Sequence, residues 1–166
     1  MEEHPELLIY GYGNPGLQDD GLGNAFVERM EDWCKKKNIS RIEFDSNYQL
    51  NVEDAEAISH KDIVIFVDAS MEPIEDFCLT RVTPAQSSIE FTMHAVSASY
   101  VLDLCNKLFD KNPDCYLMHI KGYEWDLKEG LSDKANENLE KTLAFLTEQL
   151  ENPDGLVERL KGLVNG

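Results

Sequence analysis

A glycine-rich stretch near the N-terminus, residues 11–23, constrains the fold more than any other part of this sequence. It follows the apolar run 7–10 and leads into an amphipathic segment that begins near Leu22. This order predicts a strand, a tight turn and a helix. Glycines at positions 11 and 13 favour a sharp exit from the strand, because a side chain there would block the turn or the close approach of a ligand.

Two acidic residues, Asp19 and Asp20, stand at the predicted start of that helix. A dinucleotide site at such a position presents backbone amides and the positive end of the helix to a pyrophosphate. Two carboxylates would repel that ligand, so the loop is better suited to a cation or to a polar neutral group. Asp19 has a second interpretation of equal weight, in which it only caps the helix start or complements its charge.

The net charge restricts the partners of the protein. Its 166 residues suit one domain with a full core, and 15 basic against 32 acidic residues give a formal charge of −17. A chain this acidic repels nucleic acid and anionic membranes and attracts cationic partners, although acidity also serves solubility alone. With no signal peptide and no apolar run near the ~18 residues of a membrane helix, a cytoplasmic protein with reduced cysteines is expected.

Strands and helices alternate along the rest of the sequence. The continuous apolar run 63–67 predicts a strand that is covered on both faces. Further strands are expected at 42–45, 77–82 and 115–120, and further helices at 51–59, 97–109 and 132–150. The pattern predicts an α/β fold: a three-layer sandwich with a mostly parallel, twisted sheet of about five strands and helices on both faces.

The sequence after residue 151 differs from the domain before it. Residues 1–151 are expected to form a single α/β domain, and residues 152–166 a short amphipathic helix with Asn152 as its cap and Pro153 in its first turn. This helix is expected either to pack on the domain or to mediate a contact between chains. Its apolar stripe consists of Leu156, Val157, Leu160, Leu163 and Val164. Asn51 is similarly the expected cap of the helix that ends at Ser59.

Three polar residues are expected to share the carboxyl edge of the sheet. Asp20 lies in the loop after the first strand, Asp68 at the end of the most buried strand, and His94 before the next helix. Open α/β sheets bind their ligands at this edge, and two carboxylates with an imidazole are suitable ligands for a first-row transition metal. The alternative is a strand-ending aspartate and a hydrogen-bonded loop histidine. His119, on the last strand, is expected to be a core or edge residue.

The sequence of the glycine-rich stretch, G-Y-G-N-P-G-L-Q-D-D-G-L-G, resembles the G-x-G-N-x-x-x-x-D-[DE]-x-x-G signature of the hydrogenase maturation proteases. Three further features match in order: Asp68-Ala69 at a strand end, His94 before a helix, and a glycine-containing segment at 122–132. The similarity covers roughly residues 7–150. In the family, an acid at the position of Asp20, the strand-end aspartate and the histidine bind the metal, and the acid is often glutamate.

The resemblance implies an activity, a partner and a metal. Members of this family are endopeptidases that remove a C-terminal extension from the nickel-loaded large subunit of [NiFe] hydrogenases. The implied partner is that precursor, and the implied metal is the nickel that the substrate presents. Asp20, Asp68 and His94 would recognise it, with Asp19 as an auxiliary residue. Zinc or cadmium is expected to substitute in a purified sample. The segments G-Y-G-N-P-G and G-Y-E-W-D-L-K-E-G-L-S resemble sequences of the family branch that serves cytoplasmic, NAD(P)-linked bidirectional hydrogenases.

Two other functions are considered. Peptidyl-tRNA hydrolases share the opening G-x-G-N-P-G, but residues 17–21 here read L-Q-D-D-G, and a net charge of −17 disfavours a tRNA partner. The other alternative is a non-proteolytic maturation chaperone that binds a metal or a hydrogenase subunit. It stays open because the peptidase chemistry of this family has no catalytic triad whose absence would be informative.

Overall fold

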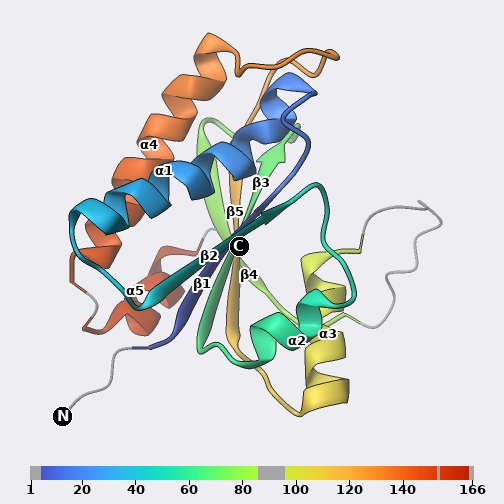
Figure 1. Cartoon of the computed structure of the whole chain (residues 1–166), viewed down its shortest axis with the longest axis vertical. Helices are drawn as coiled ribbons and strands as arrows, with labels where there is room; N and C mark the ends of the chain where they lie inside the picture. The colour runs from blue at the N-terminus through green and yellow to red at the C-terminus, as the bar shows by residue number, and fades with distance from the viewer. Residues whose placement is uncertain (1–4, 86–95, 153, 165–166) are drawn as a thin grey trace.

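The computed structural model describes residues 5–85, 96–152 and 154–164 (Figure 1). Within these residues the strands are β1 (Leu7–Tyr12), β2 (Ile42–Asn47), β3 (Ile63–Ser70), β4 (Phe77–Val82) and β5 (Asp114–Lys121). The helices are α1 (Leu22–Lys36), α2 (Asp54–Ser59), α3 (Ala98–Phe109), α4 (Asp133–Leu150) and α5 (Leu156–Leu163). A short 3-10 helix, η1 (Gln18–Gly21), connects the glycine-rich turn to α1.

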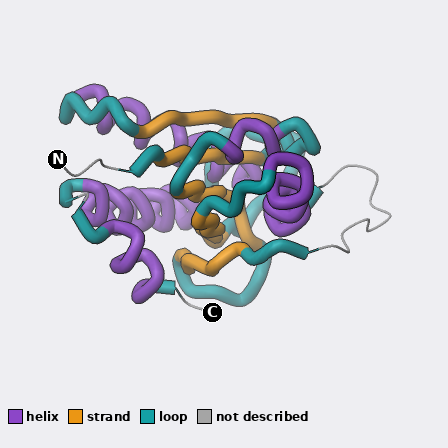
Figure 2. Tube along the Cα trace, turned by 90° about the horizontal axis from the view of Figure 1, so that it is seen from below, coloured by secondary structure: helices purple, strands orange, loops and turns teal. Residues whose placement is uncertain are grey.

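The strands form one sheet in the order β2-β1-β3-β5-β4. β1, β2, β3 and β5 run parallel, whereas β4 pairs with β5 in the antiparallel sense and occupies one edge. Helices cover both faces of the sheet, as Figure 2 shows when the strands are viewed from below. The predicted three-layer α/β sandwich with a mostly parallel five-stranded sheet is therefore confirmed.

Alternate residues of the central strands face two separate cores. Ile63, Ile65 and Val67 of β3 pack toward α1, α4 and α5, and Val64 and Phe66 pack toward α2 and α3. All five are buried, which explains why this strand reads as a continuous apolar run instead of an alternating one.

The C-terminal helix α5 packs on the domain. Leu156 and Leu160 are buried in the core that α1 and α4 also line, whereas Leu163 is 39% exposed. The helix starts at Leu156 and not near residue 152, so Asn152 is not its cap. Its N-cap is Gly155, which has a φ of 74° that glycine adopts without strain. Pro153, the expected first-turn residue, lies outside the described residues.

Helix α2 also begins later than the sequence predicts. It starts at Asp54, and Asn51 does not cap it. The Asp54 carboxylate instead accepts hydrogen bonds from the Asn51 backbone N–H (2.8 Å) and from the Tyr10 hydroxyl (2.9 Å). A tertiary contact to β1 therefore fixes the start of this short helix.

The loops that follow β1, β3 and β5 gather at the carboxyl edge of the sheet. In Figure 1 the loop before α1 and the loop before α4 meet at this edge. Their meeting is fixed by backbone hydrogen bonds from Gln18 to Lys128 and from Asp19 to Glu124, each 3.0 Å. No helix among the described residues has the length and apolar character needed to cross a bilayer.

Candidate functional site

The glycines of the N-terminal loop serve the packing of the chain against itself. A Cβ atom on Gly11 would lie 2.1 Å from the carbonyl oxygen of Gly23, so only glycine lets α1 approach β1 this closely. Gly13 has a φ of 151°, and a Cβ atom there would lie 2.0 Å from the carbonyl oxygen of Asp20. Gly13 therefore serves the tight turn, whereas Gly11 serves the close packing of α1 on β1, a reason that the sequence analysis did not give.

Asp19 is a fully buried carboxylate whose oxygens are saturated with hydrogen bonds. It accepts bonds from the backbone N–H groups of Tyr123 (2.7 Å), Glu124 (2.9 Å) and Ser132 (2.8 Å), and from the Ser132 hydroxyl (2.7 Å). Ser132 in turn caps α4 by accepting a bond from the Ala135 N–H. Asp19 therefore holds the loop between β5 and α4 against the glycine-rich loop.

The same bonds determine the charge state of Asp19. Burial by itself would raise the pKa of this carboxyl group, but the hydrogen bonds from Ser132, Tyr123 and Glu124 outweigh burial and lower the pKa below its ordinary value. The carboxylate is thus ionised, fully enclosed and supplied with donors. This environment assigns Asp19 to structure and leaves it no exposed oxygen with which to act as an auxiliary residue at the edge.

Asp20, the next residue, has different surroundings. One of its oxygens, Oδ2, accepts a hydrogen bond from the Asn14 backbone N–H (2.8 Å), and the residue is only partly buried. This bond fastens the carboxylate to the turn after β1. The tight glycine turn therefore positions Asp20 at the carboxyl edge of the sheet while leaving its second oxygen unbonded among the described residues.

Asp68 lies at the carboxyl end of β3 and belongs to the same electrostatic neighbourhood. Burial raises the pKa of this carboxyl group to about 7, the Asp20 carboxylate contributes to the rise, and a hydrogen bond from the Ala69 backbone opposes it. Burial also raises the pKa of Tyr12, and the charge of Asp68 raises it further. Asp20 and Asp68 are thus a like-charged pair near the end of β1.

A pair of partly buried carboxylates is unfavourable until a cation or a proton neutralises it. The environment of Asp20 and Asp68 therefore suits a positively charged ligand. His94, the third predicted residue, lies outside the described residues, so its position relative to the pair is an expectation. Within the described part of the chain, no three His, Cys, Asp or Glu side chains are grouped as a complete metal site.

His119 has a closer relation to this edge than sequence reasoning indicated. It is the register partner of Asp68 across the β3–β5 pairing, so the two side chains emerge on the same face of the sheet. Its Nε2 atom lies 2.9 Å from the Thr80 hydroxyl oxygen, and burial lowers its pKa, with an opposing effect of Glu72. Tyr12 was also missed. The alternation of side chains along each strand was the available signal for both residues, but it places them beside Asp68 only once the pairing of the strands is known.

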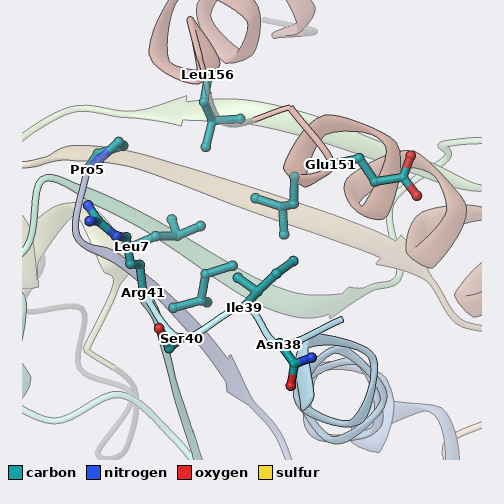
Figure 3. Close-up of a pocket in the computed structure, with 10 residues that line it drawn as sticks. Pro5, Leu7, Asn38, Ile39, Ser40, Arg41, Glu151 and Leu156 are labelled. Carbon is teal, nitrogen blue, oxygen red and sulfur yellow. The ribbon is translucent and has the colours of Figure 1, made fainter. Parts of the chain in front are cut away.

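Two cavities among the described residues have linings that include neither Asp20 nor Asp68. One, of about 280 Å³, is at the opposite edge of the sheet between the start of β1, the loop before β2 and the α4–α5 junction (Figure 3). Leu7, Ile39 and Leu156 give it a largely apolar lining. The other, of about 450 Å³, lies between α1 and the end of β2, beside Pro15.

Comparison with known proteins shows that the fold of this chain is similar to several solved structures. No protein-family model and no curated protein sequence matches the chain. The fold resembles that of a [NiFe] hydrogenase maturation protease HycI from Thermococcus kodakarensis KOD1, with a TM-score of 0.65, 22% identity, and 89% of this chain and 94% of that chain covered.

Two structures from Escherichia coli are also similar. One, described as an endopeptidase, has a TM-score of 0.67 and 19% identity, with 85% of this chain and 89% of that chain covered. The other, the hydrogenase maturating endopeptidase HybD, has a TM-score of 0.57 and 19% identity, with coverage of 86% and 93%. The chain therefore has the fold of the [NiFe] hydrogenase maturation proteases over nearly its whole length.

Proposed function

We propose that this protein is an endopeptidase that removes the C-terminal extension of a nickel-loaded [NiFe] hydrogenase large subunit. The observation that carries the proposal is the Asp20–Asp68 pair, two partly buried carboxylates at the carboxyl edge of a hydrogenase maturation protease fold. The sequence signature around residues 11–23 supports the same assignment. The resemblance also favours a cytoplasmic, NAD(P)-linked hydrogenase as the substrate's parent enzyme.

Recognition of the substrate would depend on its metal. The nickel ion carried by the precursor neutralises Asp20 and Asp68 together and removes the repulsion between them. His94 is the expected third ligand. Because Asp68 has a pKa of about 7, a fraction of it is protonated near neutral pH, and binding of the metal displaces that proton. A peptide without a metal does not offset the cost of the paired charges.

The chemical step is hydrolysis, in which water adds across one peptide bond of the bound precursor. Holding the metal at Asp20 and Asp68 places the neighbouring peptide segment at a fixed position, and such orientation can lower a barrier by several kcal/mol. The substrate's own metal can polarise the scissile carbonyl as a Lewis acid. The protein's contribution is then positioning, so a nucleophilic serine or cysteine is not required.

A cleavage assay with two precursor forms tests this proposal. Purified protein is mixed with the nickel-loaded precursor, with the metal-free precursor and with casein, and the products are separated on a gel. Shortening of the nickel-loaded form alone is expected. Cleavage of the metal-free form at a similar rate would contradict recognition through the metal.

Variants make the assay specific to the site. Asp68→Asn is expected to abolish processing, whereas Glu56→Gln, which removes one exposed charge from α2, is expected to process normally. Binding of the nickel-loaded precursor without any cleavage by the unmodified protein would instead identify a maturation chaperone.

A further inference from the structure

The cavity between α1 and the end of β2 is lined in part by the loop that carries Asp20, and it has no assigned role. This α1–β2 pocket has a volume of about 450 Å³. Its lining combines one face of α1, the residues that end β2, and one residue of the glycine-rich loop. These are Pro15, Asn24, Val27, Glu28, Glu31, Ser46, Asn47 and Tyr48.

The charged groups of the α1–β2 pocket are of one sign. Glu28 and Glu31 stand one helical turn apart, and no lysine, arginine or histidine is among the lining residues. Among the described residues, neither carboxylate has an ion-pair partner, although Arg29, between them in sequence, pairs with Glu140 at 2.7 Å. The pocket therefore presents two unneutralised carboxylates to any ligand that enters it.

The other walls have a defined shape. The Asn24 side-chain amide donates to the Ser46 hydroxyl (2.9 Å) and to the Asn47 carbonyl oxygen (3.2 Å), which ties the end of β2 to α1. Tyr48 follows directly and is 70% exposed. Val27 supplies an apolar floor. Acidic groups, an aromatic ring and an apolar floor match the three parts of an arginine side chain: guanidinium charge, planar face and aliphatic stem.

We propose that the α1–β2 pocket binds an arginine side chain of the polypeptide that the protein processes. Glu28 and Glu31 accept hydrogen bonds from the guanidinium group, and Tyr48 covers its planar face. Lysine would fill the pocket less well, because it lacks the planar fork that pairs with carboxylates and stacks on a ring. This inference rests on the proposed function, since it assigns a second recognition point to the same substrate.

The position of the pocket relative to Asp20 supports one continuous substrate segment. Pro15 lines the pocket, and its Cα atom would lie 2.8 Å from a Cβ atom on Gly21, the neighbour of Asp20. Asn14, the residue before Pro15, donates its N–H to the Asp20 carboxylate. In this proposal, a chain anchored at the carboxylate pair continues along this loop toward the pocket. The net charge of −17 further favours a basic segment over an acidic one.

A binding experiment that does not depend on cleavage tests the pocket. The amide and side-chain NMR signals of the ¹⁵N-labelled protein are followed during titration with the blocked tripeptide acetyl-Ala-Arg-Ala-amide. Shifts that saturate are expected for Asn24, Glu28 and Tyr48, and the same peptide with neutral citrulline in place of arginine should leave them unchanged. Equal shifts with both peptides would overturn the proposal.

The variant E28Q/E31Q should abolish these shifts, whereas E56Q/E148Q, which removes the same charge from two exposed sites elsewhere, should retain them. Persistence of the shifts in E28Q/E31Q would contradict the assignment. Nickel chloride alone is a further arm. If it displaces the arginine peptide and shifts the same signals, the pocket is a metal site and the proposal is wrong.

The effect on processing separates this inference from the proposed function. With nickel-loaded precursor, E28Q/E31Q should raise KM about tenfold and leave kcat nearly unchanged, because the pocket binds substrate away from the reacting bond. An unchanged KM overturns the proposal. If the unmodified protein cleaves no precursor at all, the proposed function fails, whereas arginine-specific shifts would still establish the pocket.

Discussion

Asp19 and Asp68 are two carboxylates at the same edge of one sheet, yet their environments are opposite. Asp19 is fully buried and receives four hydrogen bonds, and its pKa is lowered. Asp68 is less buried, faces the charge of Asp20 and has a pKa raised to about 7. Enclosure alone therefore does not determine whether a carboxylate is stable as an anion. The supply of donors does.

The difference separates a residue that builds the site from one that is available to a ligand. The donors around Asp19 come from the loop before α4, so its charge is used in joining two segments more than 100 positions apart. Asp68 receives a backbone hydrogen bond from Ala69 but no comparable set of donors among the described residues, so the cost of its charge in the folded state is not offset. Charge-removing substitutions should therefore have opposite effects on stability at these two positions.

The largest effect is expected for Asp19→Asn. The amide group presents its own N–H donors to backbone N–H groups, which leaves several buried donors without an acceptor. The free energy of unfolding should fall by about 3 kcal/mol or more, measured by urea unfolding at pH 7. Asp133→Asn, an exposed neighbour at the start of α4, should cost less than about 1 kcal/mol. A similar loss of stability in both variants would contradict the structural role assigned to Asp19.

Asp68→Asn should stabilise the protein at pH 8, with a gain on the order of 1–2 kcal/mol. The substitution removes a partly buried charge and its repulsion with Asp20, while the amide retains the shape of the side chain. Urea unfolding measures the gain, which should disappear at pH 5, where Asp68 of the unmodified protein is already protonated. A loss of stability at pH 8 would show that the carboxylate has a structural role like that of Asp19.

The stability of the unmodified protein should also depend on pH through both Asp68 and Asp19. The pKa of Asp68 is about 7 in the folded state and near 3.8 when unfolded, so the folded state binds more protons between these values. Its contribution to stability is therefore greatest below about pH 4 and is lost as the pH rises through 7. The pKa of Asp19 is lowered, so its contribution is present above 3.8 and is lost as the pH falls further.

These opposite dependences can be separated by comparing variants across pH. The stability of the unmodified protein minus that of Asp68→Asn should fall, to more negative values, between pH 5 and pH 8. The unmodified protein minus Asp19→Asn should give a difference that shrinks below pH 4. Two differences that vary with pH in the same direction would contradict the assigned environments.

The smallest effect is expected for Asp20→Asn, and it concerns the pKa of Asp68. Burial is the larger cause of the raised pKa of Asp68, and the charge of Asp20 is the second. Removing that charge should lower the pKa of Asp68 but leave it above the ordinary carboxyl value, as followed by the ¹³C signal of its carboxyl group. A full return to the ordinary value would show that repulsion, and not burial, controls this residue.

Much of the fold could be predicted because its signals are local. The apolar run 63–67 and the glycine-rich stretch 11–23 each determine nearby structure through burial and backbone conformation. Strand order could not be predicted, because β4 pairs antiparallel with β5 across a long intervening segment. The start of α2 was mispredicted for the same reason, since Asp54 is held by Tyr10 of β1.

The site was predictable to a lesser extent. The end of β3 indicated Asp68, but adjacent Asp19 and Asp20 carry the same chemical group and differ only in what a distant loop offers them. The relation of His119 to Asp68 depends on the register between β3 and β5, which no local pattern encodes. His94 remains a prediction from sequence.

The most direct test of this account is an anomalous diffraction measurement on crystals of the protein soaked with cadmium chloride. A single strong peak is expected within about 2.5 Å of carboxylate oxygens from both Asp20 and Asp68, with the imidazole of His94 as a further ligand. Asp19, enclosed by its own donors, should bind none. A peak at Asp19, or an empty space between Asp20 and Asp68 beside cadmium bound elsewhere, would contradict a carboxylate pair built for a metal.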